Sequence, residues 1–265
     1  MSDLNIVVCV KVVPKPEEIR VDRSTNRLER EGARSEINPP DMNAMEMALG
    51  LKDRYGGKIS IISMGPPLFD EYLRYPLAMG ADHIYLLSDR VFAGADTLAT
   101  TYTLSKGIQK IGGVDLVFCG EESSDGATGQ VPPGLAEWLD FHQLTMVSDT
   151  DVDTSRRVAI GRREIKGGYE VLEVPLPAVI SAKTASNEPR FMDYQIKSWA
   201  FEDQRITWWS QNDLNVEAEY IGVEGSPTVV SGLKQAPIRE RKRIFINGTP
   251  QEIAEQIVTK IQEIV

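Results

Sequence analysis

The first half of the chain alternates apolar, β-branched runs with segments of helical periodicity, and this alternation restricts the fold more than any other feature. The apolar runs have the composition of buried strands and lie at residues 5–13, 58–65, 83–88 and 115–120. The segments with helical spacing and helix start or stop signals lie at residues 38–57, 67–82, 96–113 and from 131 onward. Such alternation predicts βαβ units with right-handed crossovers. We therefore expect an α/β fold, with an open, mostly parallel sheet and helices on both faces.

Three local signals refine this first half. Pro76 lies inside a helical segment and predicts an interruption or kink, because proline has no N–H to donate. Asp96 stands where the N-cap of the next helix is expected. The long excursion over residues 14–37, between the first strand and its helix, contains a hairpin-like stretch.

The second half follows a different pattern. Residues 156–182 predict two strands joined by a turn at Gly167 and Gly168, with apolar side chains alternating on one face. Residues 201–247 show little periodicity and no sign of a core. A capping box starting at Thr249 then begins a closing helix with an apolar stripe.

These patterns predict two parts of the chain. We expect an α/β domain over residues 1–200. Residues 201–265 are expected to form an extended arm and a C-terminal helix that pack on a partner.

Charge and residue usage exclude several functions. The net charge of −10 argues against a general nucleic-acid or anionic-membrane binder. The one dense basic run, residues 238–245, is interpreted as a solvated strand or tail. No window approaches the about 20 apolar residues of a membrane span, and the amino terminus does not have the pattern of a signal peptide. His83 and His142 are isolated, which predicts no metal site and no catalytic histidine pair.

The two cysteines carry a separate inference. They show neither CxxC nor framework spacing, so we take them as reduced and the protein as cytoplasmic.

The stretch CGEESSDGATGQVPPGLAEWLD, residues 119–140, is the strongest candidate for a ligand site. Gly126 and Gly129 permit positive φ and close approach to the backbone, and Thr128 and Gln130 offer side-chain donors. The amides of the helix that begins at Val131 could bind an anion. A structural surface loop is the other interpretation, since neither GxxxxGK[ST] nor GxGxxG is present. The location after a parallel strand favours a phosphate or pyrophosphate cradle.

Three further positions have two interpretations each. Asp125 could bond a ribose or cap the loop. The helix start at residues 38–41 could face the same crevice or serve as an ordinary cap. Cys9 and Met64 end their strands with soft side chains, which suit contact with a flat ring as well as core packing.

Six segments resemble, in order, the beta subunit of electron-transfer flavoproteins. They are VKVV, INPPDMNAMEMALGLK, LRYPLAMGAD, CGEESSDGATGQVPPGLAEWL, REIKGGYEVLEVPLPAVISA and ASNEPRF. The resemblance runs over nearly the whole chain and is most specific in GGYEVLEVPLPAVISA and NEPR. It implies a Rossmann-like domain with a five-stranded core and an alpha-subunit partner that carries an FAD, onto which the arm reaches. It implies an electron carrier with no catalytic side chain, because the flavin carries the chemistry.

The resemblance also implies site residues. An adenine nucleotide is expected against Cys9, Lys11, Asn38, Pro39, Asp41, Met64, Gly120, Ser124, Asp125, Gly126, Ala127, Thr128, Gly129, Gln130 and Val131. The segment TASNEPRFMDYQIK resembles the loop that engages acyl-CoA dehydrogenases, and its expected contacts are Asn187, Glu188, Pro189, Arg190 and Tyr194. Tyr194 stands where the family has leucine, which leaves the partner dehydrogenase open. Pro76 and Lys166, in place of alanine and an acidic residue, are departures without a functional interpretation.

The nucleotide itself has two candidates. AMP-holding members of the family carry a loop like DDDxNQTGQ, whereas bifurcating members, which hold a second FAD and oxidise NADH, carry DGxTxQVxP. Residues 125–132, DGATGQVP, are closer to the second pattern, and small residues leave room for a flavin pyrophosphate. FAD and electron bifurcation between NADH, ferredoxin or flavodoxin, and an acyl-CoA dehydrogenase-type enzyme are therefore expected. The alternatives are a beta subunit with structural AMP and a non-redox nucleotide-binding regulator.

Overall fold

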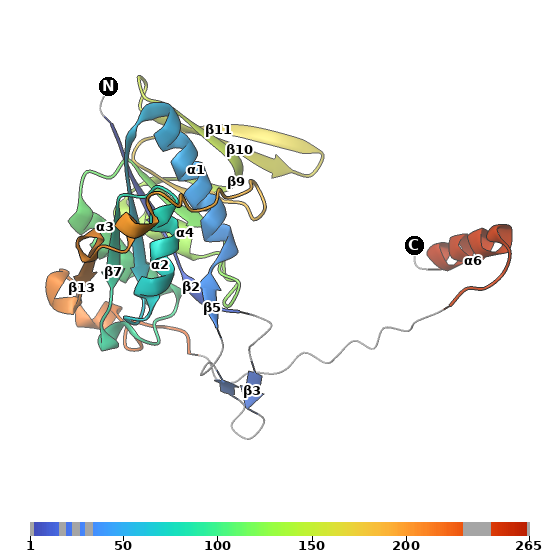
Figure 1. Ribbon diagram of the computed structural model, residues 1–265, viewed down its shortest axis with the longest axis horizontal. Coiled ribbons are helices and arrows are strands. Elements are labelled where there is room, and N and C mark those ends of the chain that lie inside the picture. Colours follow the sequence, from blue (N-terminus) through green and yellow to red (C-terminus); the bar gives the residue numbers. More distant parts are fainter. Residues whose placement is uncertain (1–2, 16–19, 23–26, 30–33, 230–244, 264–265) are drawn as a thin grey trace. The chain divides into compact units, whose positions relative to one another are not determined.

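The computed structural model describes residues 3–15, 20–22, 27–29, 34–229 and 245–263. The chain divides into two compact units, Met1–Gly232 and Leu233–Val265. The first unit contains the sheet and its covering helices, and the described part of the second is mainly helical (Figure 1).

A nine-stranded sheet forms the centre of the first unit, in the order β11-β10-β9-β12-β8-β1-β6-β7-β13. Its strands are β1 (Leu4–Cys9), β6 (Gly57–Met64), β7 (His83–Leu87), β8 (Leu116–Gly120), β9 (His142–Asp153), β10 (Val158–Ile165), β11 (Gly168–Pro175), β12 (Ala178–Ala182) and β13 (Ile206–Trp209). Strand β10 pairs antiparallel with both of its neighbours, β11 and β9. All the other neighbouring strands in this order pair in parallel. The predicted open, mostly parallel sheet is confirmed, and it extends beyond the five-stranded core that the resemblance implied.

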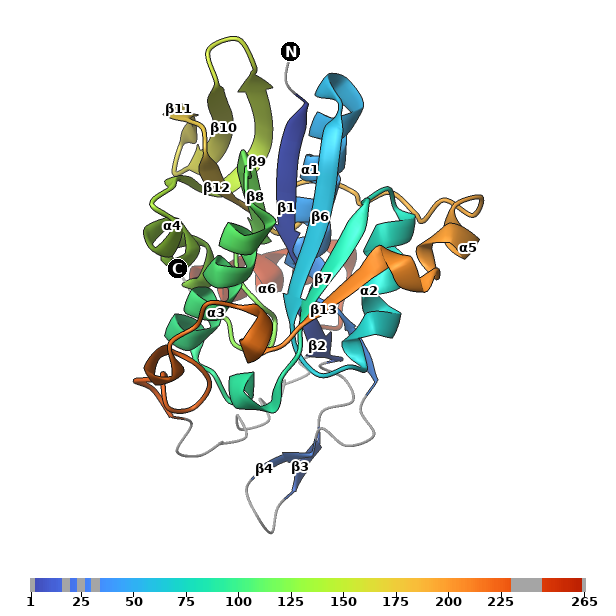
Figure 2. The ribbon, with the colours of Figure 1, turned by 90° about the vertical axis from the view of Figure 1, so that its left-hand side faces the viewer.

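Helices cover both faces of this sheet, as predicted. They are α1 (Pro39–Tyr55), α2 (Phe69–Ala78), α3 (Thr97–Ile111), α4 (Val131–Leu139) and the short α5 (Lys197–Ala200). One core lies between the sheet and α1 with α2, and it includes Ile6, Leu49 and Leu77. A second core lies between the opposite face and α3 with α4, and it includes Tyr102 and Leu135. Figure 2 shows β1 between β6 and β8 in the middle of the sheet.

The excursion that follows β1 forms two small antiparallel pairs. Strand β2 (Val12–Pro14) pairs with β5 (Ser35–Ile37), and β3 (Arg20–Asp22) pairs with β4 (Arg27–Glu29), which confirms the predicted hairpin. The prediction of one strand over residues 5–13 was wrong, because β1 ends at Cys9 and β2 belongs to a different sheet. An apolar run in the sequence does not show at which residue the chain leaves one sheet and pairs in another.

Two helix predictions had different outcomes. Asp96 caps α3 as expected, since its carboxylate accepts bonds from the N–H groups of Leu98 and Ala99. Helix α2 is not interrupted at Pro76, which lies in its last turn, and the helix continues to Ala78. Proline lacks only its own N–H bond to the carbonyl four residues earlier, and the other bonds of the helix stay possible.

The region after α4 contains strands that sequence patterns did not reveal. The stretch 156–182 forms three strands, β10, β11 and β12, instead of the expected two, although the turn at Gly167 is confirmed. Strand β9 was not predicted, because its sequence HQLTMVSDTDVD is largely polar and gains its strand character by pairing with β10 and β12. The neighbouring strands, and not the residue types of β9 itself, therefore determine that this segment is a strand.

The expectation that residues 201–247 lack a core was wrong for their first part. Strand β13 pairs with β7 at the sheet edge, and Trp209, Leu214 and Ile221 are buried. This segment is built from β13 and three 3₁₀ turns, η3 (Asp203–Arg205), η4 (Gln211–Asp213) and η5 (Ala218–Tyr220). Elements so short show no periodicity. Most of the basic run 238–245 lies outside the described residues.

The second unit holds α6 (Pro250–Gln262), which begins with the predicted capping box between Thr249 and Glu252. Its apolar stripe includes Ile257, Val258 and Ile261, each about half exposed in this chain. Val265, the last residue of the predicted C-terminal segment, lies outside the described residues. Packing of this helix on a partner stays a prediction.

Candidate functional site

The carboxyl ends of β1 and β8 meet at the point where the winding of the sheet reverses. From β1 the chain winds through β6 to β7, and it then returns to place β8 on the other side of β1. Helix α1 packs on one face and α4 on the other. In open α/β sheets, ligands bind in the crevice at such a switch point.

Asp41, in the first turn of α1, joins these two strand ends. Its Oδ2 accepts a 2.7 Å bond from the backbone N–H of Lys11, and its Oδ1 accepts a 3.0 Å bond from that of Gly120. The side-chain amide of Asn38 donates a third bond, of 3.0 Å, to Oδ1. We call this arrangement the Asp41 clamp. It holds β1, β8 and the start of α1 in one fixed geometry.

Burial makes the Asp41 clamp electrostatically unusual. The side chain is almost inaccessible to solvent, and this desolvation raises the pKa of the carboxyl from 3.8 to about 6. The bonds from Lys11, Asn38 and Gly120 act in the opposite direction and limit the rise. Asp41 therefore changes its charge near neutral pH, unlike an ordinary aspartate.

Asn38 fixes the loop that follows β8. Its Nδ2 donates to the carbonyl of Glu122 at 2.9 Å, and its Oδ1 accepts from the N–H of Ser124 at 3.0 Å. Its own N–H donates to the carbonyl of Lys11. Asn38 is almost fully buried, so the helix start and the loop form one hydrogen-bonded unit.

Lys11 reaches the same loop through its side chain. The ammonium lies 2.6 Å from Oδ1 of Asp125 and 3.3 Å from the hydroxyl of Ser123. Desolvation opposes ionisation of Asp125, but the bond and charge of Lys11 outweigh it, so the pKa of Asp125 lies below its usual value. The Lys11 side chain is 47% exposed, so its ion pair with Asp125 is accessible to a ligand at the loop.

The loop itself has the backbone that a cradle needs. Ala127 and Gly129 have φ of 45° and 63°, and the N–H of Ala127 bonds to the carbonyl of Ser123. Gln130 occupies the N-cap position of α4, and its Oε1 accepts a 2.9 Å bond from the hydroxyl of Thr97. That bond orients the amide and links the loop to the start of α3.

The structure brings together part of the predicted set of nucleotide-binding residues. Lys11, Asn38, Asp41, Gly120, Ser124 and Asp125 form a single hydrogen-bonded network, and residues 126–131 continue from it along the chain. Cys9 and Met64 lie on the α3 side of the sheet, where Cys9 is part of the second core and Met64 packs against it. Thr97 was missed, although its place beside the predicted cap Asp96 was a usable signal.

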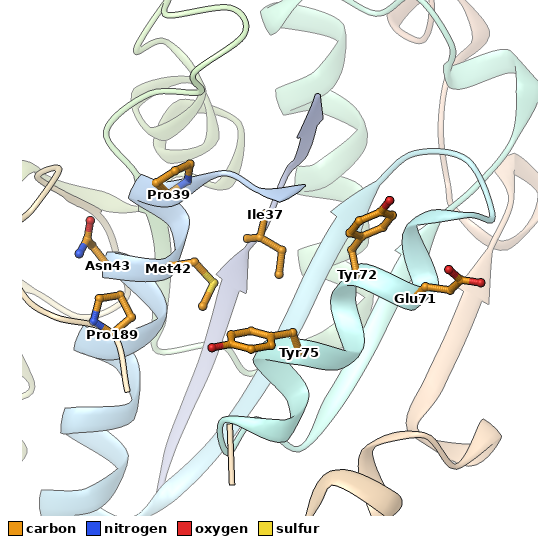
Figure 3. A pocket seen from close by; sticks show the side chains of 8 residues that line it. All are labelled: Ile37, Pro39, Met42, Asn43, Glu71, Tyr72, Tyr75 and Pro189. Carbon is orange, nitrogen blue, oxygen red and sulfur yellow. The ribbon is translucent and has the colours of Figure 1, made fainter. Parts of the chain in front are cut away.

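Pro39 lies on the opposite face of the sheet, which α1 and α2 cover. It lines a separate groove of about 560 Å³ between these two helices. Ile37 and Met42 point into this groove, and Tyr72 and Tyr75 line it from α2 (Figure 3). Pro189 and Asn43 close one end. The groove is mostly apolar and contains none of the phosphate-cradle residues.

The segment predicted to contact a dehydrogenase is anchored to α1. Asn187 exchanges hydrogen bonds with Asn43, and the Arg190 guanidinium pairs with Glu46 at 2.9 Å and Asp53 at 2.8 Å. Glu188 is exposed, and Pro189 is partly buried. Tyr194 is 81% exposed, so only part of this set projects from the surface.

Two other kinds of feature are absent from the part of the chain that the structure describes. Among them, no three or more His, Cys, Asp or Glu side chains gather as a metal site would require. None of the described helices combines the length and apolar character needed to cross a bilayer.

Comparison with known proteins gives consistent matches. Residues 25–203 match the electron transfer flavoprotein domain. The beta subunit of electron transfer flavoprotein from Clostridium acetobutylicum is 42% identical over 260 residues, which cover 98% of each chain. The caffeyl-CoA reductase-Etf complex subunit CarD of Acetobacterium woodii is 40% identical over 261 residues, again 98% of each. Protein FixA of Azotobacter vinelandii is 40% identical over 266 residues, covering 97% of this chain and 94% of the relative.

Proposed function

The chain belongs to the electron transfer flavoprotein family as a beta subunit, and from this premise we propose that it binds FAD at the switch point of its sheet. We propose further that it pairs with an alpha subunit holding a second FAD, in the cytoplasm. The pair would pass electrons by bifurcation from NADH to ferredoxin or flavodoxin and to an acyl-CoA dehydrogenase-type enzyme.

The observation that carries the nucleotide site is the close approach of backbone at Gly120. A Cβ there would lie 2.5 Å from Oδ1 of Asp41, so β8 and the start of α1 meet where only glycine fits. The loop beyond it combines two positive φ angles, small side chains and the first turn of α4. Such backbone suits the pyrophosphate of a dinucleotide.

Within this site the residues have separate tasks. Lys11 would supply positive charge to a phosphate, and Gln130, oriented by Thr97, would offer its amide nitrogen. Asn38 and the Asp41 clamp would hold the loop without taking part in electron transfer. FAD, when bound, supplies one- and two-electron chemistry, and the chain positions it and excludes water.

FAD is preferred over AMP because residues 125–132 are small, as described for the bifurcating pattern. The name of one relative, a subunit of a caffeyl-CoA reductase-Etf complex, supports a partner that acts on CoA esters.

The first test is nucleotide content. The chain is co-expressed with its alpha subunit and purified with FAD present, and the nucleotides are extracted and quantified by chromatography. Two FAD per heterodimer, no AMP and reduction by NADH would support the proposal. One FAD with one AMP would assign this subunit a structural nucleotide and would refute bifurcation. Stable ATP binding by the chain without an alpha subunit would favour the regulator instead.

Tyr194→Ala is expected to slow electron transfer to the acyl-CoA dehydrogenase-type partner about tenfold or more, with the nucleotide content unchanged. The exposed ring is available as an interface anchor, and its loss removes little folding stability. The matched control is Tyr169→Ala, since Tyr169 is also exposed but lies on β11. Stopped-flow reduction of the partner measures the rate, and equal rates for the two variants would remove Tyr194 from the interface.

A further inference from the structure

The only two cysteines of the chain are neighbours in the sheet. Strands β1 and β8 pair in parallel, and their register ends with Val8 opposite Phe118. The next residue on each strand is a cysteine, so Cys9 and Cys119 occupy adjacent positions at the two carboxyl ends. Both side chains belong to the core beneath α3 and α4. They therefore lie on the same face of the sheet.

Their spacing is compatible with a covalent bond. Neighbouring strands lie about 4.8 Å apart, and disulfide-bonded cysteines have Cα separations of roughly 4.4–6.8 Å. Both residues are free thiols, and both are buried in the same core. Strand β1 ends at Cys9, and β8 ends one residue after Cys119.

The two cysteines are also close in the chain to the residues that the Asp41 clamp holds. Gly120 follows Cys119, and Lys11 is two residues after Cys9; these are the two residues whose backbone N–H groups bond to Asp41. Cys9 is 7% exposed, compared with 3% for Cys119. A change in the distance between the sulfur atoms would thus act on the two strand ends that the clamp holds together.

We propose that Cys9 and Cys119 are a redox-sensitive modification site, where hydrogen peroxide generates a disulfide that weakens nucleotide binding. The more exposed Cys9 sulfur attacks the peroxide, so that an S–O bond forms, the O–O bond breaks and one water is released. The Cys119 sulfur then attacks the Cys9 sulfenic acid. The S–S bond forms, the S–O bond breaks, and the departing hydroxide takes the thiol proton as a second water.

The environment of Cys119 determines the rate of the second step. The contact with Cys9 and burial raise the pKa of the Cys119 thiol well above its ordinary value. Since the thiolate is the nucleophile, disulfide formation is expected to be slow at neutral pH and faster at alkaline pH. Occupancy of the nucleotide site is expected to slow the reaction by covering Cys9.

The test uses the heterodimer treated with hydrogen peroxide at several pH values, with and without excess FAD. Peptide mapping under non-reducing conditions is expected to detect a peptide pair linking Cys9 and Cys119, which dithiothreitol separates. After denaturation, the thiol count of this chain falls from two to none. Nucleotide affinity of the oxidised protein, measured by fluorescence titration, is expected to fall about tenfold and to recover on reduction.

Cys9→Ala and Cys119→Ala are the matched controls, and neither is expected to lose affinity reversibly on peroxide treatment. Thiols that stay free, or oxidise separately without a cross-link, would overturn the proposal. The cross-link is detected by peptide mapping of the wild-type protein, so this result does not depend on whether the variants fold. It is also independent of whether FAD or AMP is bound, so failure of the proposed function would not be mistaken for failure of this site.

Discussion

Gly120→Ala is expected to lower nucleotide affinity about a hundredfold or more and to destabilise the fold by roughly 2–3 kcal/mol. The added Cβ would lie 2.5 Å from Oδ1 of Asp41, 2.6 Å from Cβ of Pro40 and 2.8 Å from the backbone N of Asp41. Contacts this short are repulsive, so either β8 or the first turn of α1 must move. That movement would separate the strand end from the loop that follows it.

Local rearrangement cannot relieve this clash. Two of the three atoms belong to the backbone and proline ring of the α1 start. The third, Oδ1 of Asp41, accepts a bond from Asn38, and the other oxygen of the same carboxylate accepts one from the N–H of Lys11. None is the free end of a flexible side chain. The cost therefore falls on the Asp41 clamp and on the loop that it positions.

The measurement compares nucleotide retention and urea unfolding of wild type and variant. Gly168→Ala serves as the matched control, because a Cβ at Gly168 meets no atom within 4 Å and its φ is not positive. The control is expected to bind normally and to unfold at nearly the wild-type urea concentration. Normal nucleotide binding by Gly120→Ala would mean that the switch point is not the nucleotide site.

Asp41→Asn is expected to change how stability depends on pH. The pKa of Asp41 is raised from 3.8 to about 6 in the folded state, so between these values the folded protein holds a proton that the unfolded chain has lost. The free energy of unfolding therefore falls as pH rises through this interval, by about 3 kcal/mol from this group. The stabilising contribution is complete below about pH 4 and is lost above about pH 6.

The amide that Asp41→Asn introduces does not titrate, so the variant would lack that slope. One amide oxygen replaces two carboxylate oxygens, and the NH₂ group would face at least one of the donors on Lys11, Gly120 and Asn38, which would lower nucleotide affinity about tenfold. Urea unfolding between about pH 4 and pH 7 gives the wild-type-minus-variant difference in the free energy of unfolding. That difference should fall up to about pH 6 and then level off; a flat difference would show that Asp41 titrates normally.

Sequence patterns were sufficient to predict the helices and strands whose buried residues recur at a regular spacing. The strands around β1 are continuous apolar runs and the main helices have repeated apolar positions, so their order implied a parallel sheet and a switch point. The glycines and prolines around residue 130 marked the loop, because they restrict or release φ locally. The family resemblance was likewise carried by contiguous motifs.

Other elements depend on their neighbours in space. Strand β9 is polar, and β13 has only four residues; each is a strand because an adjacent strand supplies its hydrogen bonds. No periodicity within the segment records such pairing.

The same distinction applies to the site. The sequence determined that the loops after the parallel strands gather at one edge of the sheet, since the alternation of strands and helices along the chain follows from the apolar pattern. Only the tertiary structure decided that Asp41 bonds Gly120, 79 residues away, that Lys11 meets Asp125, and that Cys9 adjoins Cys119. Those contacts depend on how β1 and β8 are aligned, and alignment results from packing between distant segments that no local pattern encodes.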